Sequence, residues 1–194
     1  MEKRFDGKFH KNLKIYMPFT LNQIKQNFAY KGRFYLFVLC RLFSVFVAFY
    51  LWSAIFDSSS NSTLGGFTKS EMITYIFMSF ISSGIVYISI ARDIGSDVVD
   101  GSIAINLIKP IEYRTKLFFQ ALGEMVYKFV VPSLFLWIGI EIYRVNVLNL
   151  NMTSIKNICL FIFSSLCSFF IYFLFDFCFG MLAFYTTYVW GMNI

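Results

Sequence analysis

The chain has 194 residues, of which 58% are hydrophobic and only 14% charged, and its formal net charge is +6. About a quarter of the residues of a soluble domain are charged, so this composition excludes an ordinary soluble domain. The apolar runs are continuous and exceed the alternating segments of about ten residues that build a transmembrane barrel. The composition therefore predicts an all-α, polytopic integral membrane protein.

Residues 1–33 form a basic tail that contains a predicted amphipathic helix, "TLNQIKQNF". Thr20 and Gln23 have the spacing of a capping box, which predicts that the helix begins at Thr20. The apolar residues that follow share one face of this helix: Leu21, Ile24 and Phe28. Such a helix lies in the membrane interface with its lysines near anionic headgroups. The alternative is a solvated basic tail.

The remaining chain, residues 34–194, is predicted to form the transmembrane domain. The apolar run from Ile158 to Ile194 is too long for one span, because a helix rises about 1.5 Å per residue and the hydrocarbon core is about 30 Å thick. We therefore expect a tight turn near Asp176 and Gly180. About five spans result, at residues 34–56, 72–91, 117–143, 157–176 and 178–194.

Positive residues near the span ends predict the orientation of the chain. The basic tail places the N-terminus in the cytoplasm. The loop at residues 92–116 also carries basic residues, and two predicted spans separate it from the tail. This loop is therefore expected to face the cytoplasm as well.

The cytoplasmic loop, "RDIGSDVVDGSIAINLIKPIEYRTK", has the pattern of an ordered segment. A short acidic helix should end at Gly101, since glycine tolerates a positive φ. Ser102 is expected to cap a second short helix that stops at Lys109-Pro110. The acidic residues should face water, whereas the apolar residues need cover from the bilayer interface, the rest of the fold or a partner. We interpret the loop as a partner-docking surface.

Charged residues also fall inside the apolar runs. Arg41 costs about 2.5–3.5 kcal/mol at the centre of a span, so we expect it to snorkel or to form a structural ion pair; a site for an anionic substrate is the alternative. Glu124 and Lys128 are four residues apart, which predicts a helical ion pair. Asp176 is interpreted as a turn residue, with a substrate or proton site as the alternative.

No residue pattern predicts catalysis. His10 is the only histidine, and the four cysteines lie in apolar runs without a CxxC pair. The phosphate-binding patterns GxxxxGKS and GxxxxGKT are absent from the sequence. We therefore expect no enzymatic activity, no cofactor, no metal site and no nucleic-acid partner.

The segment "ARDIGSDVVDGSIAINLIKPIEYRTKLFFQALGEM" resembles the permeases of type 2 ATP-binding-cassette (ABC) exporters, within a bacterial group of permease components. In that family an acidic stretch, a glycine, a small residue, apolar residues, a basic-Pro pair and a Leu-Gly pair follow the second span. The matching positions here are Asp97–Asp100, Gly101, Ser102, Ile105–Ile108, Lys109-Pro110 and Leu122-Gly123.

The resemblance implies a subunit of an ABC exporter in the bacterial cytoplasmic membrane. It implies six spans, pairing with a second permease copy or a relative, and two separate cytoplasmic ABC ATPase subunits that drive transport. Carried over by position, the ATPase-coupling residues are Asp93, Ile94, Gly95, Asp97, Val98, Asp100 and Gly101.

The family's last span has no counterpart before Ile194, which leads us to expect a truncated, split or naturally short relative. The alternative function is a non-transporting immunity or accessory protein that binds a partner in the bilayer.

Overall fold

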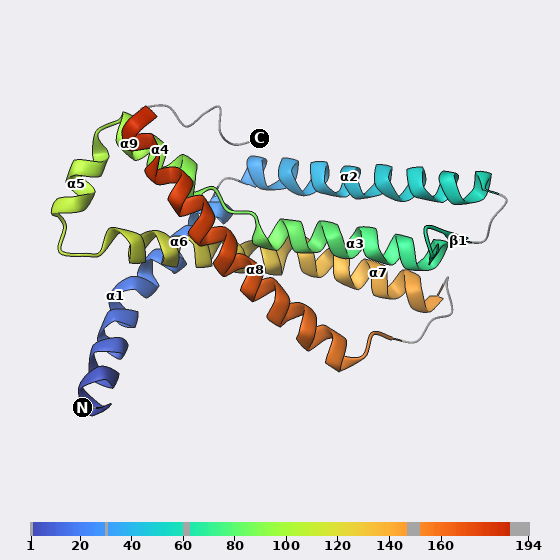
Figure 1. Ribbon diagram of the computed structural model, residues 1–194, viewed down its shortest axis with the longest axis horizontal. Coiled ribbons are helices and arrows are strands. Elements are labelled where there is room, and N and C mark those ends of the chain that lie inside the picture. Colours follow the sequence, from blue (N-terminus) through green and yellow to red (C-terminus); the bar gives the residue numbers. More distant parts are fainter. Residues whose placement is uncertain (1, 30, 60–62, 147–151, 187–194) are drawn as a thin grey trace. The chain divides into compact units, whose positions relative to one another are not determined.

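The computed structural model describes residues 2–29, 31–59, 63–146 and 152–186. The chain divides into two compact units (Figure 1). Unit 1 combines Met1–Ala29, Tyr87–Tyr127 and Cys167–Ile194, and unit 2 combines Tyr30–Val86 and Lys128–Leu166. Each unit is therefore built from segments that are far apart in the sequence.

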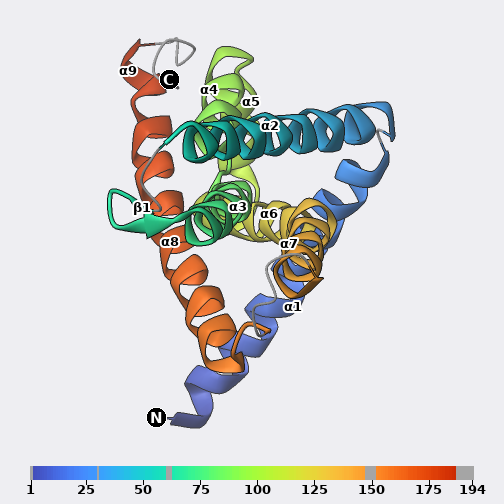
Figure 2. The same ribbon diagram turned by 90° about the vertical axis from the view of Figure 1, so that its right-hand side faces the viewer.

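Unit 2 is a layer of helices whose members α2, α3 and α7 lie side by side (Figures 1 and 2). Isoleucines form the most deeply buried part of its core, including Ile73 and Ile81 of α3 and Ile140 of α7. The elements of unit 2 are α2 (Lys31–Ser58), β1 (Thr63–Leu64), β2 (Phe67–Thr68), α3 (Lys69–Val86), the π-helix η1 (Phe129–Ser133), α7 (Leu134–Asn146) and the first part of α8 (Ile155–Met181).

Unit 1 consists of helices around the loop between α3 and α6. Its elements are α1 (Glu2–Ala29), α4 (Ile90–Val99), α5 (Ser102–Ile108), α6 (Tyr113–Lys128), the second part of α8 and the short helix α9 (Ala183–Thr186). Phe118 of α6 packs against α8, with ring centroids 5.1 Å from Phe173 and 5.7 Å from Phe170. These aromatic contacts join α6 to the second part of α8.

Apolar side chains cover the outer surface of the helices. Leu39 and Phe43 of α2 are 68% and 64% exposed, as is typical of residues that face lipid. Four helical segments of the described chain are long and apolar enough to cross a membrane: Val38–Ser58, Lys69–Val99, Tyr113–Asn146 and Ile155–Thr186. The prediction of an all-α, polytopic membrane protein is thus confirmed.

Local sequence signals account for several irregular positions. Gly65 and Gly66 both have a positive φ, of 58° and 84°, and turn the chain between β1 and β2. The sequence did not predict this hairpin. Pro132 lies inside η1, because proline removes a backbone donor and the helix widens there.

The predicted turn at Asp176 and Gly180 is wrong. Helix α8 continues through both residues to Met181, so the end of the fourth predicted span and the beginning of the fifth lie in one helix. The length argument assumed that a helix ends where the hydrocarbon ends, but a helix can tilt or extend past the bilayer. Residues 187–194 of the fifth predicted span lie outside the described residues.

The predicted helix start at Thr20 is also wrong. Helix α1 passes through Thr20 without a break, from Glu2 to Ala29. The Thr20 hydroxyl instead donates a hydrogen bond to the carbonyl oxygen of Phe119, at 2.8 Å. The Thr20 hydroxyl therefore bonds to a residue of α6, ninety-nine positions away, and does not cap a helix as the local spacing predicted.

Candidate coupling loop

The loop between α3 and α6 folds as two short helices joined at a glycine corner. Helix α4 ends at Val99, and the Asp100 N–H donates to the Ser96 carbonyl oxygen at 2.9 Å. Gly101 follows with a φ of 70°, which an L side chain rarely adopts. Helix α5 then runs to Ile108, and Lys109 is extended before Pro110. The predicted helix–glycine–helix–proline order is thus confirmed.

The carboxylate of Asp97 joins the two short helices of this loop to the start of α6. It accepts hydrogen bonds from Ser102 Oγ at 2.7 Å, Asn106 Nδ2 at 3.0 Å and the Tyr113 hydroxyl at 2.8 Å. These donors lie on α5 and at the start of α6, whereas Asp97 lies on α4. Gly101 occupies the N-cap position of α5, and Ser102 is the first residue of the helix and donates to Asp97, so the predicted capping role of Ser102 is wrong. The carboxylate that we expected to face water holds the loop together.

Two lysines complete this network around Asn106. The Nζ atoms of Lys109 and Lys116 donate to Asn106 Oδ1 at 3.2 and 3.3 Å. Asn106 is only 9% exposed, and the buried side of α5 is therefore polar. The outer side of α5 is apolar, because Ile105, Leu107 and Ile108 are all exposed.

Helix α4 also packs on the second part of α8. The N–H of Ala91 donates to Asp176 Oδ2 at 2.9 Å, which places a carboxylate at the N-terminus of α4. An anion there satisfies a backbone donor and interacts favourably with the helix dipole. Gly180 lies so close to α4 that an added Cβ would be 2.6 Å from Ile94 Cδ1. Asp176, which lies within α8, thus caps the N-terminus of α4 and is not a turn residue.

The predicted coupling residues occupy different environments. Ile94 and Gly95 are buried, and Val98 is partly buried against Ala91 and Ala183. The exposed members of the predicted set are Asp93, Asp100 and Gly101. Three residues that we did not predict are also exposed on α4: Arg92, Ser96 and Val99. We call Arg92, Asp93, Ser96, Val99 and Asp100 the α4 outer face.

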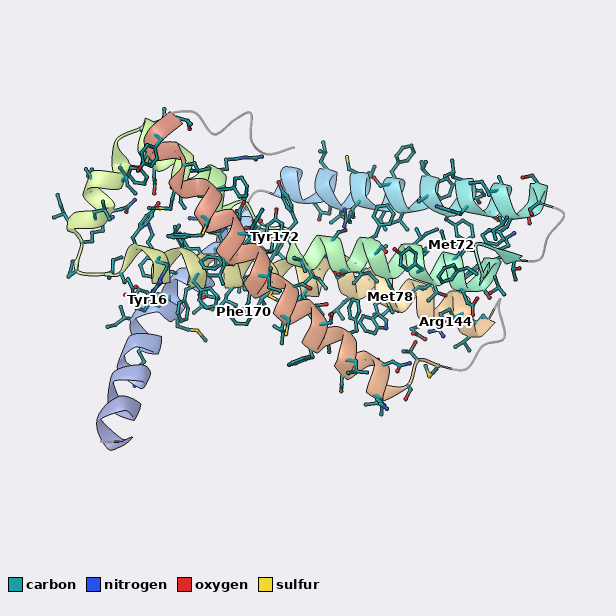
Figure 3. The ribbon with its side chains drawn as sticks, viewed as in Figure 1. Tyr16, Met72, Met78, Arg144, Phe170 and Tyr172 are labelled. Carbon is teal, nitrogen blue, oxygen red and sulfur yellow. The ribbon has the colours of Figure 1, made fainter. Side chains whose placement is uncertain are left out.

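Helix α1 packs on α6 through Tyr16 and Thr20. The Tyr16 hydroxyl accepts a hydrogen bond from the Glu112 N–H at 2.9 Å, and its ring stacks on Phe119 with centroids 5.6 Å apart (Figure 3). Leu21 and Phe28 remain about half exposed, at 52% and 48%. This exposed apolar face is consistent with the predicted location in the membrane interface.

Arg41 is held by α3 within unit 2. Its Nη2 donates to the Phe80 carbonyl oxygen and, at 2.7 Å, to Ser83 Oγ, and its guanidinium lies 5.2 Å from the centroid of the Phe80 ring. Gly84 makes room, since an added Cβ would be 3.2 Å from Arg41 Nη2. The contacts described for Arg41 are therefore hydrogen bonds and a cation–π contact rather than an ion pair.

Glu124 and Lys128 lie one turn apart on α6, and Lys128 is only 9% exposed. Their ion pair stays a prediction. Across the described ranges, no group of three or more His, Cys, Asp or Glu residues could hold a metal ion. The four cysteines are exposed and form no disulfide: Cys40, Cys159, Cys167 and Cys178.

Comparison with known proteins identifies the family. A family model described as "ABC-2 family transporter protein" matches residues 42–193, which include every element from most of α2 to the C-terminal segment. Comparison with curated proteins and with solved structures gave no match. The matched region contains the α4–α5 corner and the membrane-spanning helices that flank it. The chain therefore belongs to the ABC-2 transporter family, as a multi-pass membrane component of a transport system that is not itself catalytic.

Proposed function

We propose that the chain is a permease subunit of an ATP-driven ABC exporter, and that the α4 outer face docks on a separate cytoplasmic ATPase subunit. The N-terminus and the α4–α5 loop then face the cytoplasm of a bacterial cell, and a second permease copy or a relative completes the transport path.

One observation carries this proposal: the loop is a braced structure that still presents an exposed surface. The hydrogen bonds to Asp97 fix α4, α5 and the start of α6 relative to one another. The α4 outer face is left exposed, with the charges of Arg92, Asp93 and Asp100 on it. A rigid element of this kind transmits a push from a partner, whereas a flexible linker would absorb it.

The chain connections define which helices such a push reaches. Helix α4 follows the membrane-spanning helix α3 after only Tyr87–Ser89, and α6 follows α5 after Lys109–Glu112. Asp176 and Gly180 add a contact between α4 and α8. In the proposed mechanism, ATP binding moves α4. Helices α3, α6 and α8 then change their tilt together and alter access to the transport path.

The docking surface can be tested by charge reversal. Asp93→Lys with Asp100→Lys changes two exposed charges on α4 and leaves the Asp97 network intact. The full chain would be co-expressed with candidate ABC ATPases from the same genome and purified through a tag on the permease. We expect the ATPase to be lost from the double variant and retained by Asp57→Lys, which changes an exposed acid next to the α2–α3 hairpin.

Retention of the ATPase by the double variant would overturn the proposed docking surface. Stimulation of ATP hydrolysis after reconstitution of the wild-type complex supports a transporter, since a non-transporting accessory protein would leave the ATPase rate unchanged. Both measurements use the complete chain in a lipid environment.

A further inference from the structure

Unit 2 contains a pocket of about 510 Å³ between α3, α7 and the beginning of α8. This volume falls within the range of about 300–1,000 Å³ that is typical of small-molecule sites. Figure 3 labels Met78 and Arg144, which belong to two of its walls. The lining residues used below are Thr74, Met78, Trp137, Arg144, Thr153, Asn157 and Phe161.

The polar end of the pocket holds a compensated ion pair. Arg144 Nη1 lies 3.1 Å from Glu141 Oε1, and the two side chains are only 18% and 15% exposed. The Thr153 hydroxyl donates to Glu141 and accepts from Arg144, and the Thr153 N–H donates to Glu141 Oε2 at 3.4 Å. The acid and the base cancel, so this end has hydrogen-bonding groups but no net charge. Among the described residues, Arg144 Nε has no acceptor.

The other end of the pocket is apolar. Trp137 and Phe161 meet edge to face with ring centroids 5.3 Å apart, and Met78 completes the wall. Aromatic faces and a thioether provide contact area for an aliphatic or aromatic group. This end supplies no charge.

On each of the three helices, the polar lining residue lies at the same end of the pocket and the apolar lining residue lies at the other end. On α3, Thr74 precedes Met78 by one turn, and on α8, Asn157 precedes Phe161 by one turn. Helix α7 runs in the opposite direction, with Trp137 about two turns before Arg144 near its end. The lining of the pocket therefore changes from polar to apolar over roughly 6–10 Å. A bilayer likewise changes from polar to apolar between its interface and its hydrocarbon core.

From this arrangement we infer that the pocket binds an amphiphile with an uncharged, hydroxyl-bearing head group and an apolar tail. The head group lies among Thr153, Asn157 and the Arg144–Glu141 pair, and the tail lies along Trp137 and Phe161. An anionic head group would compete with Glu141 for Arg144, and a cationic one would compete with Arg144 for Glu141. Either would leave a mostly buried charge uncompensated, which is costly. Hydroxyl groups both donate and accept, as do the threonine and asparagine side chains.

The test uses the full chain in lipid nanodiscs without an ATPase, and an octyl glucoside that carries a photoreactive diazirine in its alkyl tail. We expect the cross-links to concentrate on Met78, Trp137 and Phe161. An excess of octyl glucoside should suppress them at least tenfold better than octyl sulfate or octyl trimethylammonium.

Two variants and a control locate the site. Thr153→Val with Asn157→Leu removes hydrogen-bonding groups of the polar end, and Met78→Trp fills the apolar end without touching the ion pair. Both are expected to reduce labelling at least tenfold. Phe135→Ala removes a 71% exposed aromatic ring of α7 that does not line the pocket, and labelling should be unchanged. Size-exclusion profiles identify any variant that fails to fold.

Labelling spread evenly over the lipid-facing helices would overturn the inference. Equal competition by the charged amphiphiles, or full labelling of a folded Met78→Trp variant, would do so as well. The site deepens the proposed transport function by naming a ligand class. The photolabelling is done without an ATPase, so its outcome does not depend on whether the α4 outer face binds an ATPase. Conversely, an absence of specific labelling would not affect the co-purification test of the α4 outer face.

Discussion

The carboxylate of Asp176 accepts a hydrogen bond of 2.9 Å from the backbone N–H of Ala91, which lies eighty-five positions earlier in the chain. One residue belongs to a membrane-spanning helix, and the other lies in the first turn of the α4 helix that we propose as the ATPase contact. The second part of α8 is thereby attached to the N-terminus of α4, and Asp176 is only 7% exposed. A buried carboxylate is tolerated here because it satisfies a backbone donor that is itself buried.

Substitution of Asp176 should weaken α4 in a graded manner. Asp176→Asn keeps an oxygen acceptor but loses the charge, whereas Asp176→Leu loses both. Loss of an N-terminal cap costs about 0.5–2 kcal/mol, so we expect Asp176→Leu to destabilise the protein more than Asp176→Asn. Hydrogen exchange of the α4 backbone in detergent or nanodiscs measures the effect. Equal protection of α4 in both variants and wild type would contradict the assignment of Asp176 as a cap.

Gly180 allows α8 to approach α4, and its replacement by alanine should push the two helices apart. The new Cβ would lie 2.6 Å from Ile94 Cδ1 and 3.0 Å from Ala91 Cα. Real Cβ atoms do not approach that closely, so one of the helices must move, and overpacking of this kind costs about 1–3 kcal/mol.

Gly139→Ala is the matched control for Gly180→Ala, since an added Cβ at position 139 would meet nothing within 4 Å. It should raise stability slightly, because alanine is favoured over glycine in a helix by about 1 kcal/mol. Ile94→Val, which removes Cδ1, should partly rescue Gly180→Ala. Thermal unfolding followed by fluorescence compares the four proteins. A Gly180→Ala variant as stable as Gly139→Ala would refute the close contact.

Removal of the Asp97 carboxylate should loosen α5 while leaving the membrane-spanning helices intact. Asp97→Ala leaves the Asn106 and Tyr113 donors without this acceptor and leaves Ser102 Oγ with only the Asp97 backbone oxygen, at 3.4 Å; an unsatisfied buried group costs about 1–3 kcal/mol. Tyr113→Phe removes one donor only and should have a smaller effect. The measurement is hydrogen exchange over Ser102–Ile108, with α2 as an internal reference. Faster exchange in both segments would indicate general unfolding and contradict a local role.

Short-range signals predicted the shape of the loop, and long-range contacts decided what its residues do. Gly101 and Pro110 interrupt helices through their own backbone geometry, so the sequence alone placed the corner and the stop correctly. The roles of Asp97 and Asp176 depend on donors 5 to 16 and 85 positions away, respectively. A pattern of spacing along one helix contains no information about such partners.

The same limit explains the errors at Thr20 and at the predicted turn. Thr20 has the spacing of a cap, but packing on α6 offered its hydroxyl the Phe119 carbonyl oxygen, and the helix continued. Asp176 is polar in an apolar run, which suggested a break in the chain. Its acceptor role toward Ala91 removes the need for one. The membrane class, in contrast, follows from composition, because lipid-exposed surface requires apolar residues wherever the helices lie.

Substitutions at Arg41, in the membrane-spanning part of α2, can show whether this residue has a structural role or binds a substrate. The Phe80 carbonyl oxygen and the Ser83 hydroxyl both accept from its guanidinium, so we expect Arg41→Met to weaken the packing of α2 on α3. A hydrogen bond to a charged group contributes about 1.5–3 kcal/mol, and Ser83→Ala, which removes one acceptor, should cost less than Arg41→Met. Arg41→Lys keeps the charge but not the fork of donors, so its loss of stability should fall between those of these two variants.

The melting temperature in nanodiscs would show this order for a structural arginine. A substrate-binding arginine would instead leave the melting temperature of all three variants at the wild-type value, because an unoccupied substrate site contributes nothing to the packing of the two helices.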